Sequence, residues 1–453
     1  MTNYQKAIII GGGIAGKLAA RVLSDLFQEV IILERDLKTE EPIPRKGAPQ
    51  GAHLHALLLA GQSGLEELFP GITEKFHSSG AVKINSTRDL AWFHHGVWKL
   101  RFDGGYTTTL QTRPNLEWLV EQYIYRIPNV TVMYGQTVQN YHFDEKQNRV
   151  LGVVVQDGSG SLQTLGADLF VDASGASSFS QSWLNKRGVH IPQEKVKIGL
   201  SYITRMFELN ENCDRDWAIK LLYPNPPHEK IGGTISKVEG NRHIVTIIGY
   251  HNEIDEKSVL KNDQGFIDIA KKLPKLDIYQ EIKDAKPLSK TTIYRVPHIT
   301  WRRFDKVKNL PEGLLLIGDA ICRIDPVFGQ GMSISVLEVL ALQKLLRSTN
   351  QSRQLPVSFQ KQAAKIIAPI WNMVITEDYR YPETIGKKPL GLPFLQWYAK
   401  KIFLLSTKDK EIYNTFIKVM NLLKPMTILM HPKLIGKVMM HRDGSSVSSR
   451  KNS

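Results

Sequence analysis

A glycine-rich stretch near the start of the chain restricts the fold more than any other feature. Residues 11–36 read GGGIAGKLAARVLSDLFQEVIILERD, and the apolar run KAIII precedes them. Gly11, Gly13 and Gly16 have the G-x-G-x-x-G spacing, and a second apolar run ends at Glu34. This order predicts a strand, a tight turn, a helix and a second strand parallel to the first. The chain is therefore expected to contain a βαβ unit of a doubly wound sheet.

The same residues predict a binding site for a dinucleotide. Gly11 permits the tight turn, Gly13 lets the backbone approach a pyrophosphate at the helix N-terminus, and Gly16 lets the helix pack on the sheet. Glu34 lies 18 residues beyond Gly16, where a ribose hydroxyl needs an acceptor. The alternative is a glycine-rich turn without a ligand. The pattern alone leaves open whether the dinucleotide is NAD(H) or FAD.

Length and composition indicate a globular protein with more than one core. At 453 residues, 42% hydrophobic and 23% charged, the chain suits two closely packed domains and an appendage. The polar start MTNYQK and the lack of an apolar run near about 18 residues predict a cytoplasmic protein without a membrane span. Two cysteines, Cys213 and Cys322, are too few for a thiolate metal cluster. His94 and His95 have no neighbours in sequence that complete a metal site, so we expect no bound metal.

The basic charge of the chain is concentrated at its C-terminal end. The net charge is +15, and residues 386–453 contain 13 lysines and arginines against 3 acids. These cations alternate with apolar residues, as in PFLQWYAKKIFLL, a pattern more typical of a surface for lipid or a greasy ligand than of a nucleic-acid-binding arm. We therefore expect no nucleic-acid partner. Peripheral membrane contact through this tail is one interpretation, and a helical cap with solvated lysines is the other.

Hydrophobic patterning along the chain predicts a mixed α/β (α+β) architecture in three parts. Residues 1–80, 111–190 and 305–350 carry strand and helix patterns that suit one discontinuous Rossmann-type domain. Residues 81–110 and 191–304 alternate as antiparallel strands and predict an inserted β-rich domain for the substrate. Residues 351–453 are expected to form a C-terminal helical cap that ends in a disordered tail, DGSSVSSRKNS.

Local patterns also predict where particular helices begin and which side they bury. An apolar helix is expected from about His55. Another is expected in TRPNLEWLVEQYIYRI, with Asn115 near its first turn. In the C-terminal region, one face with helical spacing consists of Ile412, Phe416, Val419, Met420 and Leu423.

Six motifs occur in order between residues 6 and 346: GGGIAG, ILERD, RKGAPQGAHLHAL, TRPNLEWLV, ADLFVDASGASS and LLLIGDAICRIDPVFGQGMS. Together they resemble the FAD-dependent monooxygenases of the aromatic-hydroxylase type, whose fold also includes squalene epoxidase, flavin halogenases and geranylgeranyl reductases. The third and last motifs are most similar to the bacterial flavin epoxidases of polyether biosynthesis. The resemblance implies that the bound dinucleotide is FAD.

The resemblance also implies which residues bind the cofactor. Asp319 would accept from a ribityl hydroxyl and Glu34 from the adenosine ribose. Arg113 would lie near the phosphates and the ribityl chain, and Val138 near adenine. Arg45 is expected to reach the flavin or a carboxylate, and the alternative is that it is exposed on the surface. The full expected set is Gly11, Gly13, Ala15, Gly16, Glu34, Arg35, Arg45, Arg113, Val138, Asp319, Pro326, Gly329, Gly331 and Met332.

The turn PVFGQGMS would place backbone N–H groups of Gly329, Gly331 and Met332 at a helix N-terminus, facing the pyrimidine edge of the flavin. That edge becomes anionic on reduction, so these donors and the helix dipole would stabilise it. One departure from the family pattern is DASGASS, in which Asp172 and Gly175 are separated. The role of that motif in FAD and nicotinamide contact is therefore not assigned.

The activity that the resemblance implies is oxygen transfer to a lipophilic polyketide or terpenoid of secondary metabolism, by epoxidation or hydroxylation. NADH or NADPH would reduce FAD, and O2 would then give a flavin C4a-hydroperoxide. Because that species is itself the oxidant, no catalytic side chain is assigned. A prenyl reductase of the geranylgeranyl type is the alternative, and a flavin-binding or lipid-docking protein without turnover is a third interpretation. Halogenation is a minor option, because the W-x-W-x-I-P signature is absent.

Several aromatic side chains have two interpretations. His53 and His55 contact the flavin or substrate, or they pack within their own loop. Trp92, Phe93 and Trp98 line the substrate cavity, or they belong to an aromatic core.

Overall fold

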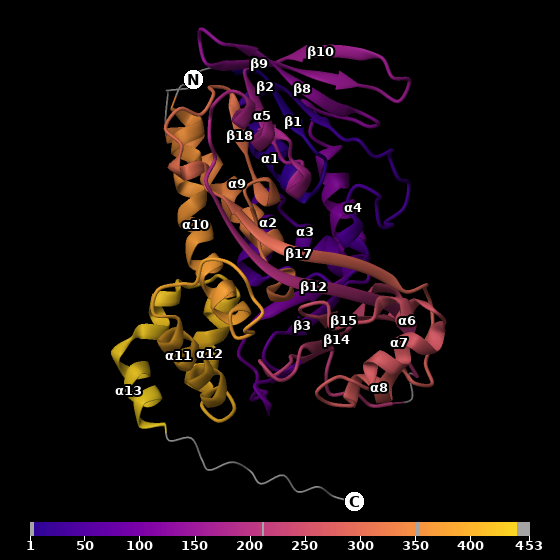
Figure 1. Cartoon of the computed structure of the whole chain (residues 1–453). Coiled ribbons are helices and arrows are strands. Elements are labelled where there is room, and N and C mark those ends of the chain that lie inside the picture. The colour runs from indigo at the N-terminus through magenta and orange to yellow at the C-terminus, as the bar shows by residue number, and fades with distance from the viewer. Residues whose placement is uncertain (1–3, 211–212, 349–353, 442–453) are drawn as a thin grey trace, which may run out of the picture.

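Helices lie between a group of strands at one end of the molecule and a large sheet near the other end, with a group of C-terminal helices beside that large sheet (Figure 1). The computed structural model describes residues 4–210, 213–348 and 354–441. The tail that we expected to be disordered, residues 443–453, lies outside these ranges. Helices and strands are mixed throughout, which confirms the expected α/β class.

The first sheet is parallel and has the strand order β18-β11-β1-β2-β7. Its strands are β1 (Tyr4–Ile10), β2 (Phe27–Leu33), β7 (Val130–Met133), β11 (Leu169–Asp172) and β18 (Leu314–Leu316). The apolar runs of β1 and β2 are almost fully buried, as central strands of a parallel sheet covered on both faces must be. β18 follows the β-rich segment in sequence, so the chain returns to its first sheet there.

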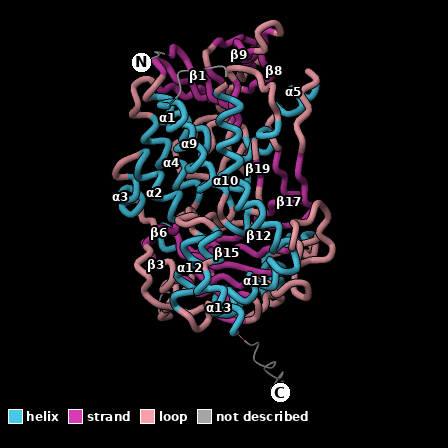
Figure 2. The backbone as a smooth tube through the Cα atoms, turned by 90° about the vertical axis from the view of Figure 1, so that its left-hand side faces the viewer, coloured by secondary structure: helices cyan, strands magenta, loops and turns pink. Residues whose placement is uncertain are grey.

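Helices cover this sheet and run beside one another (Figure 2). They are α1 (Ile14–Ser24), α2 (Leu59–Leu68), α3 (Ile72–Ser78), α4 (Arg113–Ile124), α5 (Ser180–Lys186), α9 (Gly331–Ser348) and α10 (Leu355–Asp378). α1 contacts α4 and α9, and α9 contacts α10. α4 begins as expected, because the Thr112 hydroxyl accepts from the N–H of Asn115. A small antiparallel sheet of β8 (Thr137–Asp144), β9 (Arg149–Gln156) and β10 (Leu162–Gly166) lies above them in Figure 1.

The expected start of α2 at about His55 was wrong, because the helix begins at Leu59. The segment before it is held in extended form by hydrogen bonds. Nδ1 of His53 lies 2.7 Å from the Thr204 hydroxyl, and Nδ1 of His55 lies 2.9 Å from the carbonyl oxygen of His53. These bonds fix both histidines in the loop ahead of the helix.

The large β-rich sheet is mostly antiparallel and has the order β19-β17-β12-β15-β14-β13-β4-β5, with β16 beside β12. Its strands are β4 (Leu90–His94), β5 (Val97–Trp98), β12 (Gln193–Glu208), β13 (Ile219–Leu222), β14 (Ile231–Val238), β15 (Arg242–Gly249), β16 (Lys286–Pro287), β17 (Thr292–Arg302) and β19 (Cys322–Arg323). β3 (Val82–Asn85) and β6 (Thr107–Leu110) form a separate pair. The short helices α6 (Glu256–Leu260), α7 (Asp263–Ala270) and α8 (Asp277–Ile282) cover one side of the large sheet.

The C-terminal helices are α11 (Leu392–Leu405), α12 (Lys410–Met420) and α13 (Pro432–Met440). They share a core with Trp92 of the large sheet. Ile412, Phe416 and Val419 are buried, as the helical spacing predicted. Leu423 is exposed, because α12 ends before it. No helix among the described residues is both long and apolar enough to cross a bilayer.

Candidate cofactor and substrate site

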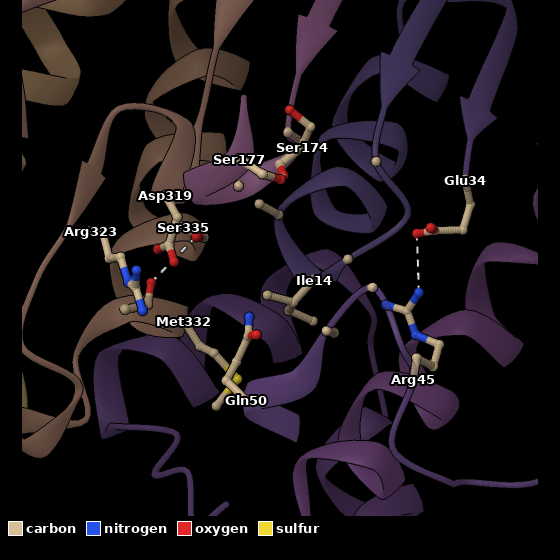
Figure 3. Close-up of a pocket in the computed structure, with 18 of the residues that line it drawn as sticks. Ile14, Glu34, Arg45, Gln50, Ser174, Ser177, Asp319, Arg323, Met332 and Ser335 are labelled. Carbon is tan, nitrogen blue, oxygen red and sulfur yellow. Dashed lines mark hydrogen bonds and ion pairs between the residues drawn. The ribbon is translucent and has the colours of Figure 1, made fainter. Parts of the chain in front are cut away.

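A first cavity of about 290 Å³ lies where the carboxyl ends of β1, β2 and β11 meet the N-termini of α1 and α9 (Figure 3). Open α/β sheets commonly bind ligands at this edge. Of the fourteen residues that the sequence predicted for the cofactor, thirteen line this cavity. Gly16 does not line the cavity. It faces the glycine turn, since a Cβ at that position would lie 1.9 Å from the carbonyl oxygen of Gly11. Its role is close packing of α1 on the turn.

At two glycines the backbone borders open space into which a phosphate group or the edge of a ring would fit. A Cβ at Gly13, which caps α1, or at Gly331, the first residue of α9, would have no neighbouring atom within 4 Å. The first N–H groups of a helix have no partner within the helix, and its N-terminus carries partial positive charge. Both helices thus present donors to one cavity, so an anionic pyrophosphate and an electron-rich ring edge fit the residues present.

Glu34 directly follows β2 and stands at the adenosine end predicted for the cavity. Its Oε2 accepts from the N–H of Gly12 at 2.9 Å, and its Oε1 from the N–H of Asp36 at 2.9 Å. Nη1 of Arg45 lies 3.1 Å from the same Oε2 (Figure 3). A carboxylate has about four acceptor positions. Glu34 therefore keeps one for a ribose hydroxyl.

Arg45 links two acidic residues that are far apart in sequence. Its Nη2 lies 3.0 Å from Oε2 of Glu117, which also binds Arg113 at 2.6 Å. Burial disfavours the charge of Arg45, but Glu117 and Glu34 together raise its pKa above the usual value. The network fixes the loop 36–58 against α4 at the edge of the cavity.

His55 joins this network in a neutral form. Burial, followed by the charge of Arg113, lowers the pKa of His55 to about 3. Nη1 of Arg113 lies 3.1 Å from Nε2 of His55, and Nδ1 faces the carbonyl oxygen of His53. Nδ1 therefore carries the proton, and Nε2 accepts from the guanidinium. His55 positions Arg113 and also lines the cavity.

Asp319 lies in a short turn, Gly318–Ala320, that follows β18, and it faces the cavity (Figure 3). Burial raises the pKa of its carboxyl, while Arg323, Arg113 and Arg302 oppose that rise. A short acceptor surrounded by three arginines suits a hydroxyl donor of a ligand. Met332 and Arg323 lie beside it in Figure 3.

A buried pair of carboxyl groups supports the turn that precedes α9. The N–H of Val327 donates to Oδ1 of Asp325 at 2.9 Å, and the Tyr250 hydroxyl donates to its Oδ2 at 2.8 Å. Burial and the charge of Asp325 raise the pKa of Asp378 well above its usual value. The pKa of Asp325 is also raised, because its carboxyl is buried. The turn before α9 and the end of α10 thus bring two buried carboxyl groups close enough for each to affect the pKa of the other.

Sequence reasoning missed several residues of the first cavity. Gln50 and Ser174 lie within predicted motifs and Ser335 lies two residues beyond one, so the motifs could have suggested them. Arg323 is four residues beyond Asp319, and the motif that contains it gave no reason to select it. Tyr294 comes from β17 of the large sheet, and no local pattern indicates that it reaches the cavity.

A second cavity of about 180 Å³ adjoins the first, and Ala56, Pro326 and Gly329 line both. Its walls come from the loop before α2, from the large sheet and from α12, which contributes Ile417 and Met420. Among the described residues that line it, none has a carboxyl group, a basic side chain or an imidazole. An uncharged, largely apolar ligand suits such walls, because they offer a charge no partner.

The three aromatic residues that were considered for the substrate cavity lie in different environments. Trp92 lines it, whereas Phe93 is buried in the core beneath α6–α8. Trp98 is partly exposed and contacts Phe93, with ring centres 5.2 Å apart. Trp92 alone of the three therefore belongs to the candidate substrate site.

The two histidines that lacked partners in sequence acquire one in the fold. Nε2 of His95 lies 3.8 Å from Oε2 of Glu377, and His94 is close enough for the three to surround an ion. Both Glu377 oxygens already bind Arg380, at 2.6 and 2.9 Å. Burial, and then Lys99 and Arg380, lower the pKa of both imidazoles. The same charges would repel a divalent cation, so we assign no metal to this cluster.

Comparison with known proteins shows the family of this chain and several relatives. Residues 4–352 match the FAD binding domain family. Protein Rv3254 of Mycobacterium tuberculosis is 27% identical over 96% of this chain and 93% of that protein. Squalene epoxidase 1 of Arabidopsis thaliana is 24% identical over 75% of this chain and 59% of the epoxidase.

Solved structures share the fold. p-Nitrophenol 4-monooxygenase PnpA of Pseudomonas putida DLL-E4 superposes with a TM-score of 0.66 at 15% identity, over 94% of this chain and 100% of that chain. Flavin-dependent halogenases have the same fold. Likeness of fold at this identity does not distinguish oxygen transfer from halogenation.

Proposed function

The chain belongs to the FAD binding domain family and is an FAD-dependent monooxygenase, and on this premise we propose that it transfers one oxygen atom from O2 to an uncharged lipophilic polyketide or terpenoid. The reaction proposed is epoxidation or hydroxylation, with NADH or NADPH as reductant. The observation that carries the proposal is the second cavity, which has uncharged walls and adjoins the first cavity at Gly329.

We propose that the thirteen predicted residues around the first cavity hold FAD, with Gly16 supporting the turn from behind. Glu34 would accept from the adenosine ribose and Asp319 from the ribityl chain. The N-terminus of α1 would bind the pyrophosphate. The N-terminus of α9 would stabilise negative charge on the ring edge that faces it.

When bound, reduced flavin activates O2 and supplies the oxidant, so the chain needs no acid, base or nucleophile of its own for oxygen transfer. The chain would position the substrate and exclude water from the site of reaction. Pro326 and Gly329 form a boundary that both cavities share, which would place a substrate double bond next to the ring. Uncharged walls exclude water from the reacting groups.

The test uses purified protein loaded with FAD, together with NADH or NADPH, ¹⁸O2 and a panel of neutral terpenoid and polyketide alkenes. Oxygen transfer predicts one ¹⁸O atom in the product. Loss of a double bond without label indicates a reductase instead. A brominated product in the presence of bromide indicates a halogenase. If neither nucleotide bleaches the flavin with any candidate substrate present, oxygen transfer, reduction and halogenation are all contradicted.

The second cavity also bears on the C-terminal tail. α12 supplies part of its wall, which supports the proposal that the C-terminal helices cover the substrate site in addition to an apolar core. Peripheral membrane contact by these helices, which the sequence suggested, is consistent with a lipophilic substrate.

A further inference from the structure

An aromatic and aliphatic surface lies at the start of α11. Leu390 is 97% exposed, Phe394 52% and Trp397 39%. Phe394 and Trp397 are three residues apart and therefore lie on the same side of the helix, with ring centres 5.7 Å apart. Leu390 precedes the helix by two residues. We call these three side chains the Phe394 face.

Basic residues flank the Phe394 face on both sides. Lys387 and Lys388 precede it and Lys400 follows it, and all three are exposed. Residues 386–441 contain ten lysines, one aspartate and one glutamate. Both acids lie around the start of α12, away from the Phe394 face in sequence, where Asp409 binds Lys437 at 2.7 Å and Glu411 binds Lys433 at 2.6 Å. The segment that carries the Phe394 face is therefore strongly positive.

We propose that the Phe394 face docks on an anionic lipid bilayer. Exposed aromatic and leucine side chains enter the boundary between headgroups and acyl chains, and lysines around them attract anionic headgroups. A second copy of this chain is a poorer occupant, because it would place like charges opposite one another. Charge complementarity thus favours an acidic membrane surface.

The fold connects this face to the second cavity. α11 packs on α12, and α12 supplies Ile417 and Met420 to the cavity wall. Figure 1 shows α11, α12 and α13 together at one end of the molecule, beside the large sheet. Resting on the proposed function, this placement predicts that a lipophilic substrate moves from the bilayer into the cavity past α12. Docking itself needs no substrate and can be tested separately.

The test is sedimentation of the FAD-loaded full chain with vesicles, without substrate or reductant. Phosphatidylglycerol–phosphatidylcholine vesicles are compared with pure phosphatidylcholine, at low and at high salt. The variant carries Leu390→Glu, Phe394→Glu and Trp397→Glu. The matched control carries Leu162→Glu, Leu260→Glu and Leu276→Glu, which adds the same charge at exposed leucines elsewhere on the surface. A second variant, with Lys387→Glu, Lys388→Glu and Lys400→Glu, changes only exposed cations.

We expect the native protein and the matched control to bind the anionic vesicles at low salt and to leave them at high salt. The Phe394-face variant should bind about tenfold less or weaker still, and the lysine variant should lose its preference for anionic lipid. Unchanged flavin content checks that each variant folds. Failure of the native protein to bind, or an equal loss in the control, overturns the proposal. So does a native dimer, seen by light scattering, that becomes monomeric in the Phe394-face variant without any vesicle binding. Turnover in detergent is measured apart, so a failed docking test and a failed oxygenase test remain distinguishable.

Discussion

Oε2 of Glu338, on α9, accepts a hydrogen bond from the N–H of Gly318 at 2.7 Å. Gly318 has a φ of +65° and begins the turn that carries Asp319. Glu338 is fully buried. A side chain from the helix that opens onto the ring end of the first cavity thus holds the turn that bears the proposed ribityl ligand. The turn that bears Asp319 and the helix α9 are therefore connected in the buried core as well as at the wall of the cavity.

This carboxyl makes stability depend on pH. Burial, and to a lesser extent the charge of Asp319, raises the pKa of Glu338 to about 8. The folded protein therefore binds a proton that the unfolded chain releases near its ordinary pKa, so stability falls as pH rises from about 4.5 to about 8. Glu338→Gln keeps an acceptor for Gly318 and does not titrate. We expect its free energy of unfolding, from urea titration, to fall less over this range, by about 2–4 kcal/mol. Parallel curves for both proteins would contradict the assignment.

The glycine turn allows two substitutions with opposite effects on folding. A Cβ at Gly13 would enter open space, whereas one at Gly16 would collide with the carbonyl oxygen of Gly11 at 1.9 Å. Gly13→Val should therefore fold but fail to bind FAD, because the added side chain takes the place of the pyrophosphate. Gly16→Ala should be strongly destabilised even without cofactor. Circular dichroism and flavin content measure the two effects. Normal flavin content in Gly13→Val would remove the pyrophosphate from this turn.

Asp319 offers a test of the ring end of the site. Asp319→Ala removes a buried acceptor and should weaken FAD binding by about 1–3 kcal/mol, or roughly five- to 150-fold. Asp319→Asn keeps one acceptor oxygen and should lose less. FAD affinity is measured by quenching of flavin fluorescence. If the alanine variant binds FAD as tightly as the native protein, Asp319 is not the ribityl ligand.

Arg45 tests the adenosine end. Its removal leaves Glu34 without a side-chain partner and Glu117 with only one of its two arginines. Because Arg45 is mostly buried, Arg45→Ala should lower the free energy of unfolding of the FAD-free protein by about 1–3 kcal/mol. Arg35→Ala, at an exposed neighbour, should change it by less than about 0.5 kcal/mol. Equal changes in the free energy of unfolding of the two variants, measured by urea titration, would show that the ion pairs of Arg45 do not stabilise the fold.

The first cavity could be predicted from sequence largely because its parts are local motifs. The turn, helix, strand and acid between Gly11 and Glu34 form one continuous unit, and the turn at Asp319 and the start of α9 lie within one motif of twenty residues. The start of α2 could not be predicted, because His53 is held by Thr204, a residue 151 positions away. The same holds for Tyr294, which reaches the cavity from another sheet. The second cavity is formed by many separate segments between Leu54 and Asn421, and no pattern in any one of them describes its shape.

Met420 provides a test of the second cavity that leaves the first intact. Its side chain lines the second cavity from α12, and it does not line the first. Met420→Trp should fill part of the space, because the indole is larger and the surrounding walls are packed. We expect FAD affinity to stay unchanged, turnover of bulky lipophilic substrates to fall about tenfold or more, and small alkenes to be affected less. Release of peroxide per NAD(P)H consumed should rise, because a displaced substrate no longer accepts the oxygen. Leu423→Trp is the matched control, since Leu423 is exposed beyond the end of α12. If the Met420→Trp protein keeps native turnover and coupling for bulky substrates, the substrate binds elsewhere. If that protein loses flavin, the substitution affects the cofactor site instead.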